Sequence, residues 1–278
     1  MNDKSLPTIS VCVLVNNEVS KVEDFIMSVI DLADEIIFAD RGSTDGTVDV
    51  ITNLASRNDG KIKLYEYNFD PKEGMHFGKA KNFAMGKATK DYILCLDADE
   101  RPSAEFKVQI KQFLAERDPD VVGVVRIDEL VRHLIERVDR IAKNGKKIFY
   151  GTTPSDKVHE EFFHNFKSEF FDAPIWHCQR ETHWLQKPQQ RLFLVALEVD
   201  RTPKTKSFFG HLLRGLWLFN FKFKKVYFKQ KIYKDGWVGF KFAFMRGLHA
   251  FLVELFVGLK PTDGYRYWED RKRSAPEV

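Results

Sequence analysis

Residues 92–100 decide how the first half of this 278-residue chain is expected to fold, and they read Tyr92-Ile93-Leu94-Cys95-Leu96-Asp97-Ala98-Asp99-Glu100. The five apolar residues have the length and composition of a buried strand, and carboxylates follow where that strand ends. Two earlier runs have the same form. Ile9–Val15 is followed by Asn16, Asn17 and Glu18, and Glu35–Asp40 ends in a carboxylate.

Helical patterns separate these strands. Apolar residues recur at helical spacing over 22–32, Ser43 or Thr44 can cap a helix that runs to residue 55, and a further helix is expected over 78–88. With another strand over 61–67, the first hundred residues alternate strand and helix. This predicts an α/β fold with a mostly parallel, Rossmann-like sheet and helices on both faces. Ligands of such sheets bind beyond the carboxyl ends of the strands, where the polar clusters fall.

The remainder of the chain is less regular. Residues 128–147 are charged and give no clear prediction. The chain changes character near residue 200, so we expect a sheet-containing domain, 1–200, and a helical C-terminal appendage, 201–278. The other expected elements are a helix over 102–116, a strand over 121–127, strands and loops at 157–162 and 173–177, a helix over 187–199, and two C-terminal helices separated at Asp235 and Gly236.

Asp97 and Asp99 are the strongest chemical signal. Two carboxylates one residue apart at a strand end can face one cavity, and their oxygens suit a hard divalent cation, Mg²⁺ or Mn²⁺. Such a metal would neutralise the diphosphate of a leaving nucleotide. An acidic loop that caps the next helix is an equally open interpretation of the same residues.

Three other groups of residues have a functional and a structural interpretation. Asp40 can accept hydrogen bonds from a ribose or base, or from its own turn. Lys81 and the start of its helix can hold phosphate, or form a solvated helix face. Glu160, in His159-Glu160-Glu161, can remove a proton from an acceptor hydroxyl, or be an exposed carboxylate. His177 can add a metal ligand or be structural.

Composition limits the class of protein. The net charge is only +4, but Lys204 to Lys260 contains many Lys and Arg residues against only Asp235 and Glu254. Such asymmetry favours an anionic partner. The three cysteines form no metal-binding or disulfide pattern, the N-terminus is unlike a signal peptide, and no charge-free apolar stretch approaches the ~20 residues that span a bilayer. We therefore expect a cytoplasmic protein, peripheral on the inner face of the cytoplasmic membrane.

Several segments together resemble the family 2 glycosyltransferases, and within them the lipopolysaccharide core glucosyltransferase-like subgroup. The match is specific over about 8–101, weaker to about 178 and general afterwards. Arg41 and Asn16 depart from the usual residues. The segments that carry the resemblance are residues 11–18, 33–47, 77–84, 94–101 and 157–160, which read VCVLVNNE, ADEIIFADRGSTDGT, FGKAKNFA, LCLDADER and KVHE.

The resemblance implies a GT-A-like fold, a nucleotide-diphosphate sugar donor with a UDP-sugar favoured, a divalent metal, and inversion at the anomeric carbon. Carried over residue by residue, it implies that Glu18 and Asp40 bind the nucleoside and that Lys81 and Asn82 lie near the nucleotide. Asp97 would handle ribose, diphosphate and metal, Asp99 would be the firmer metal ligand, and Glu160 would be the catalytic base.

The C-terminal region interleaves aromatic residues with lysines, most densely over 217–229. Amphipathic helices of this kind lie in membrane interfaces. A helical cap whose aromatic residues are simply core stays open. Single-stranded nucleic acid is disfavoured, because no nucleic-acid-binding motif accompanies the patch.

The leading hypothesis is a sugar transferase that acts on a cell-surface glycan or lipid-linked acceptor, such as a lipopolysaccharide core. A polyprenyl-phosphate glycosyltransferase is an alternative, because a phosphate oxygen needs no strong general base. A catalytically inactive membrane-bound adaptor is a non-enzymatic alternative. An aspartyl phosphatase is disfavoured, because Arg101 stands where Thr or Val is expected.

Overall fold

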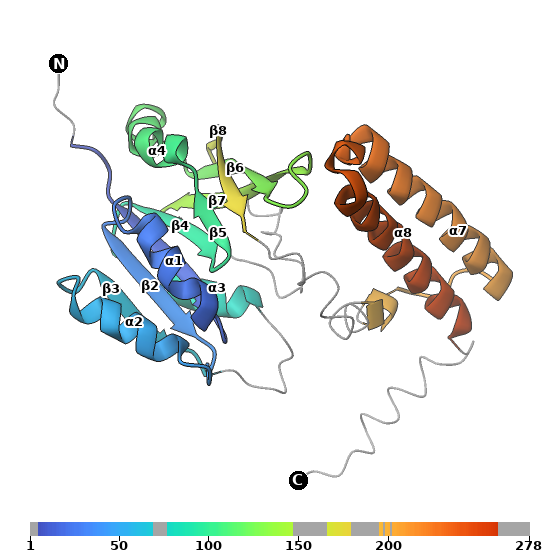
Figure 1. Ribbon diagram of the computed structural model, residues 1–278, viewed down its shortest axis with the longest axis horizontal. Helices are drawn as coiled ribbons and strands as arrows, with labels where there is room; N and C mark the ends of the chain where they lie inside the picture. The colour runs from blue at the N-terminus through green and yellow to red at the C-terminus, as the bar shows by residue number, and fades with distance from the viewer. Residues whose placement is uncertain are drawn as a thin grey trace, which may run out of the picture. The chain divides into compact units, whose positions relative to one another are not determined.

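The computed structural model describes residues 5–68, 77–146, 166–178, 195–196, 198–200 and 202–260 (Figure 1). They divide into two compact units. The sheet unit holds the described residues up to Glu129 and from Ile135 to residue 178, and the helical unit holds Leu130–Leu134 and the described residues from 195 onward. The expected domains 1–200 and 201–278 stay a prediction, because compactness alone does not show which part folds independently.

Eight strands form one mixed sheet in the order β3-β2-β1-β4-β7-β6-β8-β5. The first four in this order run parallel, as the alternating pattern predicts, whereas β7 is antiparallel to both β4 and β6. The strands are β1 (Ile9–Val15), β2 (Glu35–Asp40), β3 (Ile62–Glu66), β4 (Tyr92–Asp97), β5 (Glu100–Pro102), β6 (Val121–Asp128), β7 (Ile135–Lys143) and β8 (Ser168–His177).

Helices bury both faces of this sheet, and strand alternation assigns each residue to a face. Val11 and Val13 of β1 join the core formed with α1, α2 and α4, and Cys12 joins the smaller core formed with α3. The helices are α1 (Val19–Val29), α2 (Thr47–Ser56), α3 (Phe77–Met85) and α4 (Ala104–Arg117). Figure 1 shows α1 and α2 on one face of β1 and β2.

One local prediction needs correction, and one segment without a prediction forms a strand. The helix predicted to start at Ser43 or Thr44 begins at Thr47, because Gly46 has a left-handed φ of 92° and ends the preceding turn. The Ser43 hydroxyl instead takes part in the turn after β2. Residues 128–147, which gave no clear prediction, contain β7, whose central position next to β4 brings Arg140 into the site described below.

The helical unit contains two antiparallel helices, α7 (Phe208–Lys224) and α8 (Gly236–Leu259), which lie side by side in Figure 1. A π-helical turn (Lys225–Lys229) and a 3₁₀ turn (Ile232–Asp235) connect them, and Gly236 begins α8 as predicted. The stretch Ile232–Leu259 is long and apolar enough to cross a membrane by length and composition. This stretch contains Lys241, Arg246 and Glu254, so it is not charge-free and leaves the expectation about charge-free stretches unchanged.

Candidate functional site

The loops after β1 and β2 are held together by side chains. The Asn17 amide donates to the Ser43 hydroxyl at 2.9 Å, and the Thr44 amide donates to the Asn17 carboxamide oxygen at 2.8 Å. The Glu18 amide donates to the Thr47 hydroxyl at 2.8 Å. Asn17 has a φ of 58°, a left-handed conformation that Asn tolerates better than most residues. These bonds fix Glu18 and Asp40 at the carboxyl edge of the sheet.

Asp40 is buried and shapes its own turn. Its carboxylate accepts hydrogen bonds from the Gly42 and Ser43 amides, both at 3.0 Å, and from the Ser43 hydroxyl. The hydrogen bonds of Asp40 within its own turn are therefore formed, and they do not exclude contact with a ligand. Glu18, the other predicted nucleoside-binding residue, forms an ion pair with Lys21 at 2.9 Å.

Asp97 is paired with two cations. One carboxylate oxygen lies 2.8 Å from the Lys81 Nζ atom and the other lies 2.9 Å from a guanidinium nitrogen of Arg140. Burial opposes the charged form, but Lys81 and Arg140 outweigh it and hold the pKa of Asp97 well below its usual range. Lys81 is buried on α3, so the solvated-face interpretation of this residue is wrong. The side chain of Asp97 remains 30% exposed, which leaves it accessible to a ligand.

A buried Glu100 extends this network. Glu100 accepts hydrogen bonds from the Asp97 amide at 3.1 Å, from Arg126 at 3.2 Å and from Arg140. Arg126 also pairs with Glu136, and these carboxylates raise its pKa although burial opposes them. Removing one member of such a network leaves an uncompensated buried charge. The network therefore fixes the backbone of β4, β5 and β7 around Asp97.

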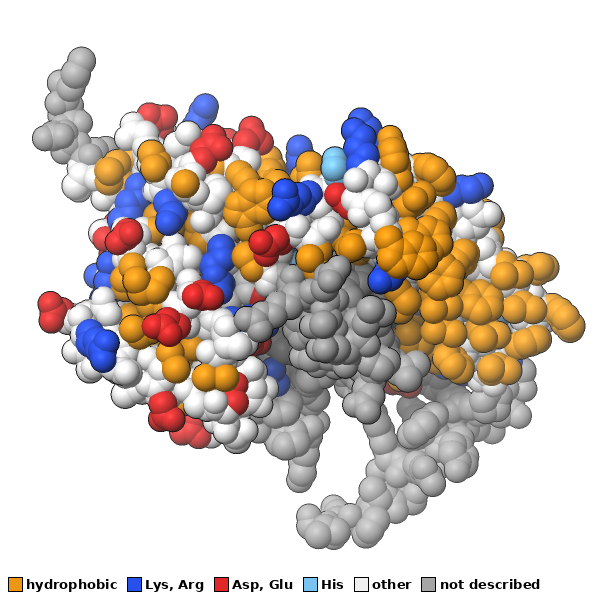
Figure 2. Space-filling view, viewed as in Figure 1, with side chains coloured by type: hydrophobic (Ala, Val, Ile, Leu, Met, Phe, Trp, Pro, Cys, Tyr) orange, Lys and Arg blue, Asp and Glu red, His pale blue; other side chains and the backbone are white. Residues whose placement is uncertain are grey.

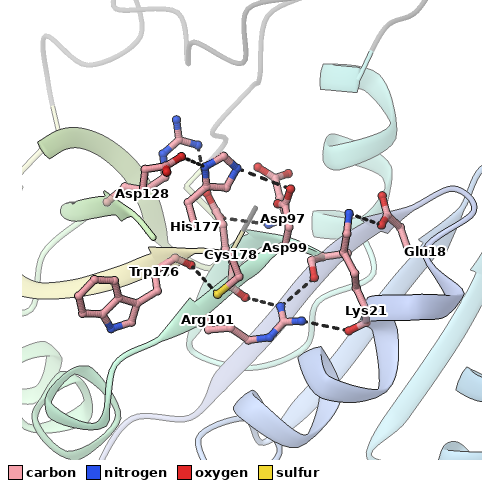
Figure 3. A network of polar contacts seen from close by, with 12 residues as sticks. Glu18, Lys21, Asp97, Asp99, Arg101, Asp128, Trp176, His177 and Cys178 are labelled. Atoms are coloured by element: carbon pink, nitrogen blue, oxygen red, sulfur yellow. Dashed lines mark hydrogen bonds and ion pairs between the residues drawn. The ribbon is translucent and has the colours of Figure 1, made fainter. Parts of the chain in front are cut away.

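Asp99 faces His177 at the end of β8. The His177 Nε2 atom lies 3.5 Å from an Asp99 oxygen, and its Nδ1 atom lies 3.2 Å from an Asp128 oxygen (Figure 3). Burial disfavours the imidazolium, but hydrogen bonds to Asp128 and Asp99 prevail and raise the pKa of His177 to about 9. In turn, His177 lowers the pKa of Asp99 against the opposing effect of burial. The Cys178 amide also donates to the Asp99 carbonyl at 2.7 Å.

Arg101 secures the loop that carries both aspartates. Its guanidinium donates to the Lys21 carbonyl at 3.0 Å (Figure 3) and to the Ala98 carbonyl at 2.8 Å. It also lies over the ring of Phe25. Because Lys21 and Phe25 belong to α1, Arg101 ties this loop to the helix that follows Glu18. The loop is thus held from both sides, by α1 and by β8.

The predicted site residues are distributed as follows. Asp40 and Asp97 end β2 and β4, whereas Glu18 and Asp99 lie in the loops after β1 and β4. Lys81 and Asn82 lie on α3. Glu160 lies outside the described residues, so its role as base stays a prediction. Sequence reasoning missed Arg126, Asp128 and Arg140. A charge inside the otherwise apolar run 121–127 was a usable signal for Arg126.

A divalent metal would have to be held by the side chains of this site. Among the described residues, no group of three or more His, Cys, Asp and Glu side chains can hold a metal ion. Asp99 offers oxygens that Mn²⁺ accepts, and His177, whose pKa is raised to about 9, offers an imidazole nitrogen only after it loses a proton. Asp97 is engaged by Lys81 and Arg140. Asp99 would therefore hold a metal together with a deprotonated His177 and ligand oxygens, and metal ligation by Asp97 and Asp99 stays a prediction.

Solved structures share the fold. The structure titled S. aureus TarS 1-349 in complex with UDP-GlcNAc matches 69% of this chain and 66% of its own, with a TM-score of 0.52 and 16% identity. A second structure, titled S. aureus TarS 1-349, matches 98% of this chain and 93% of its own, with a TM-score of 0.50 and 14% identity. At these identities the likeness shows the GT-A-like fold, as predicted.

Sequence relatives extend this finding. The SPbeta prophage-derived glycosyltransferase SunS of Bacillus subtilis (strain 168) is 34% identical over 225 residues, which are 76% of this chain and 50% of SunS. An uncharacterized glycosyltransferase of Rickettsia bellii is 30% identical over 141 residues, 51% of this chain and 44% of the relative. The chain thus spans about half the length of the curated relatives it matches.

The family comparison covers most of the sheet unit. Residues 10–193 match the family described as Glycosyl transferase family 2. This range includes both strand-end clusters, the Asp97-x-Asp99 motif and His177. The relatives named above do not bear out the lipopolysaccharide core subgroup. The predicted family is confirmed, and the chain belongs to glycosyl transferase family 2.

Proposed function

We propose that this protein transfers a hexose from a nucleotide-diphosphate sugar, with a UDP-sugar favoured, and inverts the anomeric carbon. The acceptor is a cell-surface glycan or lipid-linked molecule such as a lipopolysaccharide core. One observation carries the proposal: Asp97, Asp99 and His177 meet at the carboxyl edge of the sheet, with the cations Lys81 and Arg140 beside them. The UDP-GlcNAc bound by the similarly folded TarS supports the choice of donor.

The two ends of the site serve different parts of the donor. Glu18 and Asp40, on the loops after β1 and β2, bind the nucleoside. Lys81 lies on α3 next to Asp97 and contributes positive charge near the diphosphate. Asn82 follows it on the same helix. Because Arg140 shares Asp97 with Lys81, the site holds two fixed cations where negative charge develops as the donor bond breaks.

Mg²⁺ or Mn²⁺ is the proposed cofactor. Asp99 and His177 would hold the metal together with donor oxygens. Asp97 would become a further ligand when the metal takes the place of Lys81 or Arg140 beside it. The metal would supply charge neutralisation for the leaving nucleoside diphosphate. Asp128 orients His177 through its other ring nitrogen, a contact that commonly fixes the imidazole of a metal site.

Calorimetric titration tests the donor site. UDP-glucose, UDP-galactose, UDP-N-acetylglucosamine, GDP-mannose and ADP-heptose are titrated into the protein with Mn²⁺ and with EDTA. We expect metal-dependent binding of one donor that Asp99→Asn abolishes. Asp172→Asn, which changes an exposed carboxylate on β8, is the matched control and should bind normally. If the wild-type protein binds no donor, the transferase proposal fails and the inactive adaptor becomes the better hypothesis.

A second experiment tests the acceptor chemistry. Glu160→Gln should lower the rate of transfer to a hydroxyl acceptor by about 10²–10⁴-fold without weakening donor binding, because it removes only the base. Glu161→Gln is the neighbouring control and should retain activity. If Glu160→Gln transfers normally, a phosphate acceptor, as in the polyprenyl-phosphate alternative, is favoured over a hydroxyl.

The proposed location is the cytoplasm, at the inner face of the cytoplasmic membrane. Nucleotide sugars and lipid-linked acceptors would meet there. The exposed apolar and lysine-rich surface of the helical unit supports this location.

A further inference from the structure

The outer face of α7 is apolar along its length. Phe209, Leu213 and Trp217 are 73%, 66% and 61% exposed, and they recur at helical spacing with Leu216 and Phe221. On α8 and the turn before it, Tyr233, Trp237, Phe244, Phe256 and Leu259 are also exposed. Figure 2 shows these hydrophobic side chains gathered over the two helices. A contiguous exposed patch of this kind marks an interaction site.

Close backbone contacts bring the two helices together. Glycines bring the helices close: a Cβ at Gly247 would lie 2.9 Å from the Phe219 carbonyl oxygen, and one at Gly258 would lie 2.9 Å from the His211 Cβ. The buried His211 pairs with Glu254 at 2.8 Å across the same interface. The α7–α8 contact thus rests on these close approaches, and Phe244 adds an edge-on contact with Phe219 across it. The exposed side chains on the outer face of α7 remain available to a partner.

The partner is identified by charge. Six lysines lie at the connected end of the two helices, in the last turn of α7 and in the π-helical and 3₁₀ turns, and Asp235 is the acidic residue among them. They are Lys222, Lys224, Lys225, Lys229, Lys231 and Lys234, and most are exposed. A second copy packed in parallel would set one lysine cluster against another, which is unfavourable. An anionic lipid surface neutralises the cluster and accepts the apolar face beside it.

We propose that α7 and α8 form a monotopic membrane-binding hairpin. Its exposed apolar face enters the headgroup and acyl boundary of an anionic bilayer, and its six-lysine end contacts the lipid phosphates. The helices lie in the interface rather than span it, because Lys241, Arg246 and Glu254 are distributed along α8 and would each enter the hydrocarbon of a spanning helix. Trp217 and Trp237 suit the interfacial depth, where indole rings are enriched.

Vesicle co-sedimentation of the full chain tests this surface without donor or acceptor, so its outcome is independent of the transferase proposal. The vesicles contain phosphatidylcholine alone or mixed with phosphatidylglycerol. We expect the wild-type protein to bind the anionic vesicles, less so at high salt. Replacing Lys224, Lys225 and Lys229 with Gln should weaken binding by about a hundredfold, at about fivefold per lysine.

The apolar face is tested by Leu213→Glu with Trp217→Glu. These side chains are exposed, so the double variant should fold, as circular dichroism will show, and bind vesicles at least tenfold more weakly. Val108→Glu is the matched control, because Val108 is 81% exposed on α4 of the sheet unit, and it should bind like the wild type.

Four results would contradict the proposal. The wild-type protein could fail to sediment with anionic vesicles. It could sediment while the Lys and apolar-face variants bind equally well, in which case another surface is responsible. It could form dimers that the double Glu variant dissociates and show no vesicle binding, in which case the partner is a second copy. Resistance of bound protein to alkaline carbonate would contradict the interfacial placement and favour a spanning α8.

Discussion

The imidazole of His177 lies between two carboxylates, 3.5 Å from Asp99 and 3.2 Å from Asp128. These residues are far apart in the chain, and the pairing of β8 with β5 and with β6 brings them together. Glu100 of β5 is in register with His177, as is Asp128 of β6. The Asp97-x-Asp99 motif, which the sequence alone identified, is therefore only half of the site. The other half comes from His177 at the end of β8.

Replacing His177 with Gln should weaken metal-dependent donor binding by about 10- to 100-fold, the usual effect of losing a residue that ligates or orients ligands at a metal site. Calorimetry of the folded variant with Mn²⁺ measures this. His249→Gln, which removes a histidine paired with Glu198 in the helical unit, should bind donor normally. Unchanged donor affinity in His177→Gln would assign His177 a purely structural role.

Arg140 has a different task, because it bridges Asp97 and the buried Glu100. Arg140→Met leaves both carboxylates partly uncompensated and should lower the free energy of unfolding by about 3–5 kcal/mol. Urea denaturation measures the change. Arg137→Met, on the exposed side of the same strand and over the Phe170 ring, should lose less than about 1 kcal/mol. Equal losses in the two variants would contradict the role given to Arg140.

The sequence predicted the parallel half of the sheet well, because its strands are continuous apolar runs that end in polar clusters. It failed at β7, where Ile135, Arg137 and Asp139 are exposed while Arg140 is buried. Charged residues on such a strand suggest an exposed segment, so the sequence does not reveal that part of the strand is buried. A buried cation can be recognised only when the carboxylates that pair with it are known. Arg126, Asp128 and Arg140 were missed for this reason. The roles of Glu18, Asp40, Asn82 and Glu160 remain predictions until donor binding is measured.

Asp40→Asn separates two contributions of one carboxylate. The turn loses a charged acceptor for the Gly42 and Ser43 amides, which should lower stability by about 1–2 kcal/mol. If Asp40 also binds the nucleoside, donor affinity should fall further than in Ser43→Ala, which removes only the hydroxyl contact to Asp40. Thermal melts and donor titrations of both variants decide this. Equal donor affinities would restrict Asp40 to the turn.

Acid stability should depend on Glu35, at the opposite end of β2. This carboxylate is 2% exposed and accepts hydrogen bonds from Ser10, Thr89 and Lys63. Burial opposes its charge, but these bonds lower the pKa of Glu35 from 4.5 to about 2. A lowered folded-state pKa means that the stabilisation is complete above the unfolded value, near 4.5, and is lost as pH falls through about 2.

Glu35→Gln should therefore be less stable than the wild-type protein at neutral pH by about 2 kcal/mol, because the amide replaces a charged acceptor at a buried site. The difference should shrink as the pH falls from 4.5 towards 2. Urea midpoints measured across this range test the sign. Glu66→Gln, at an exposed position on β3, should show no such pH dependence. A stability difference that grows on acidification would contradict the assigned charge state of Glu35.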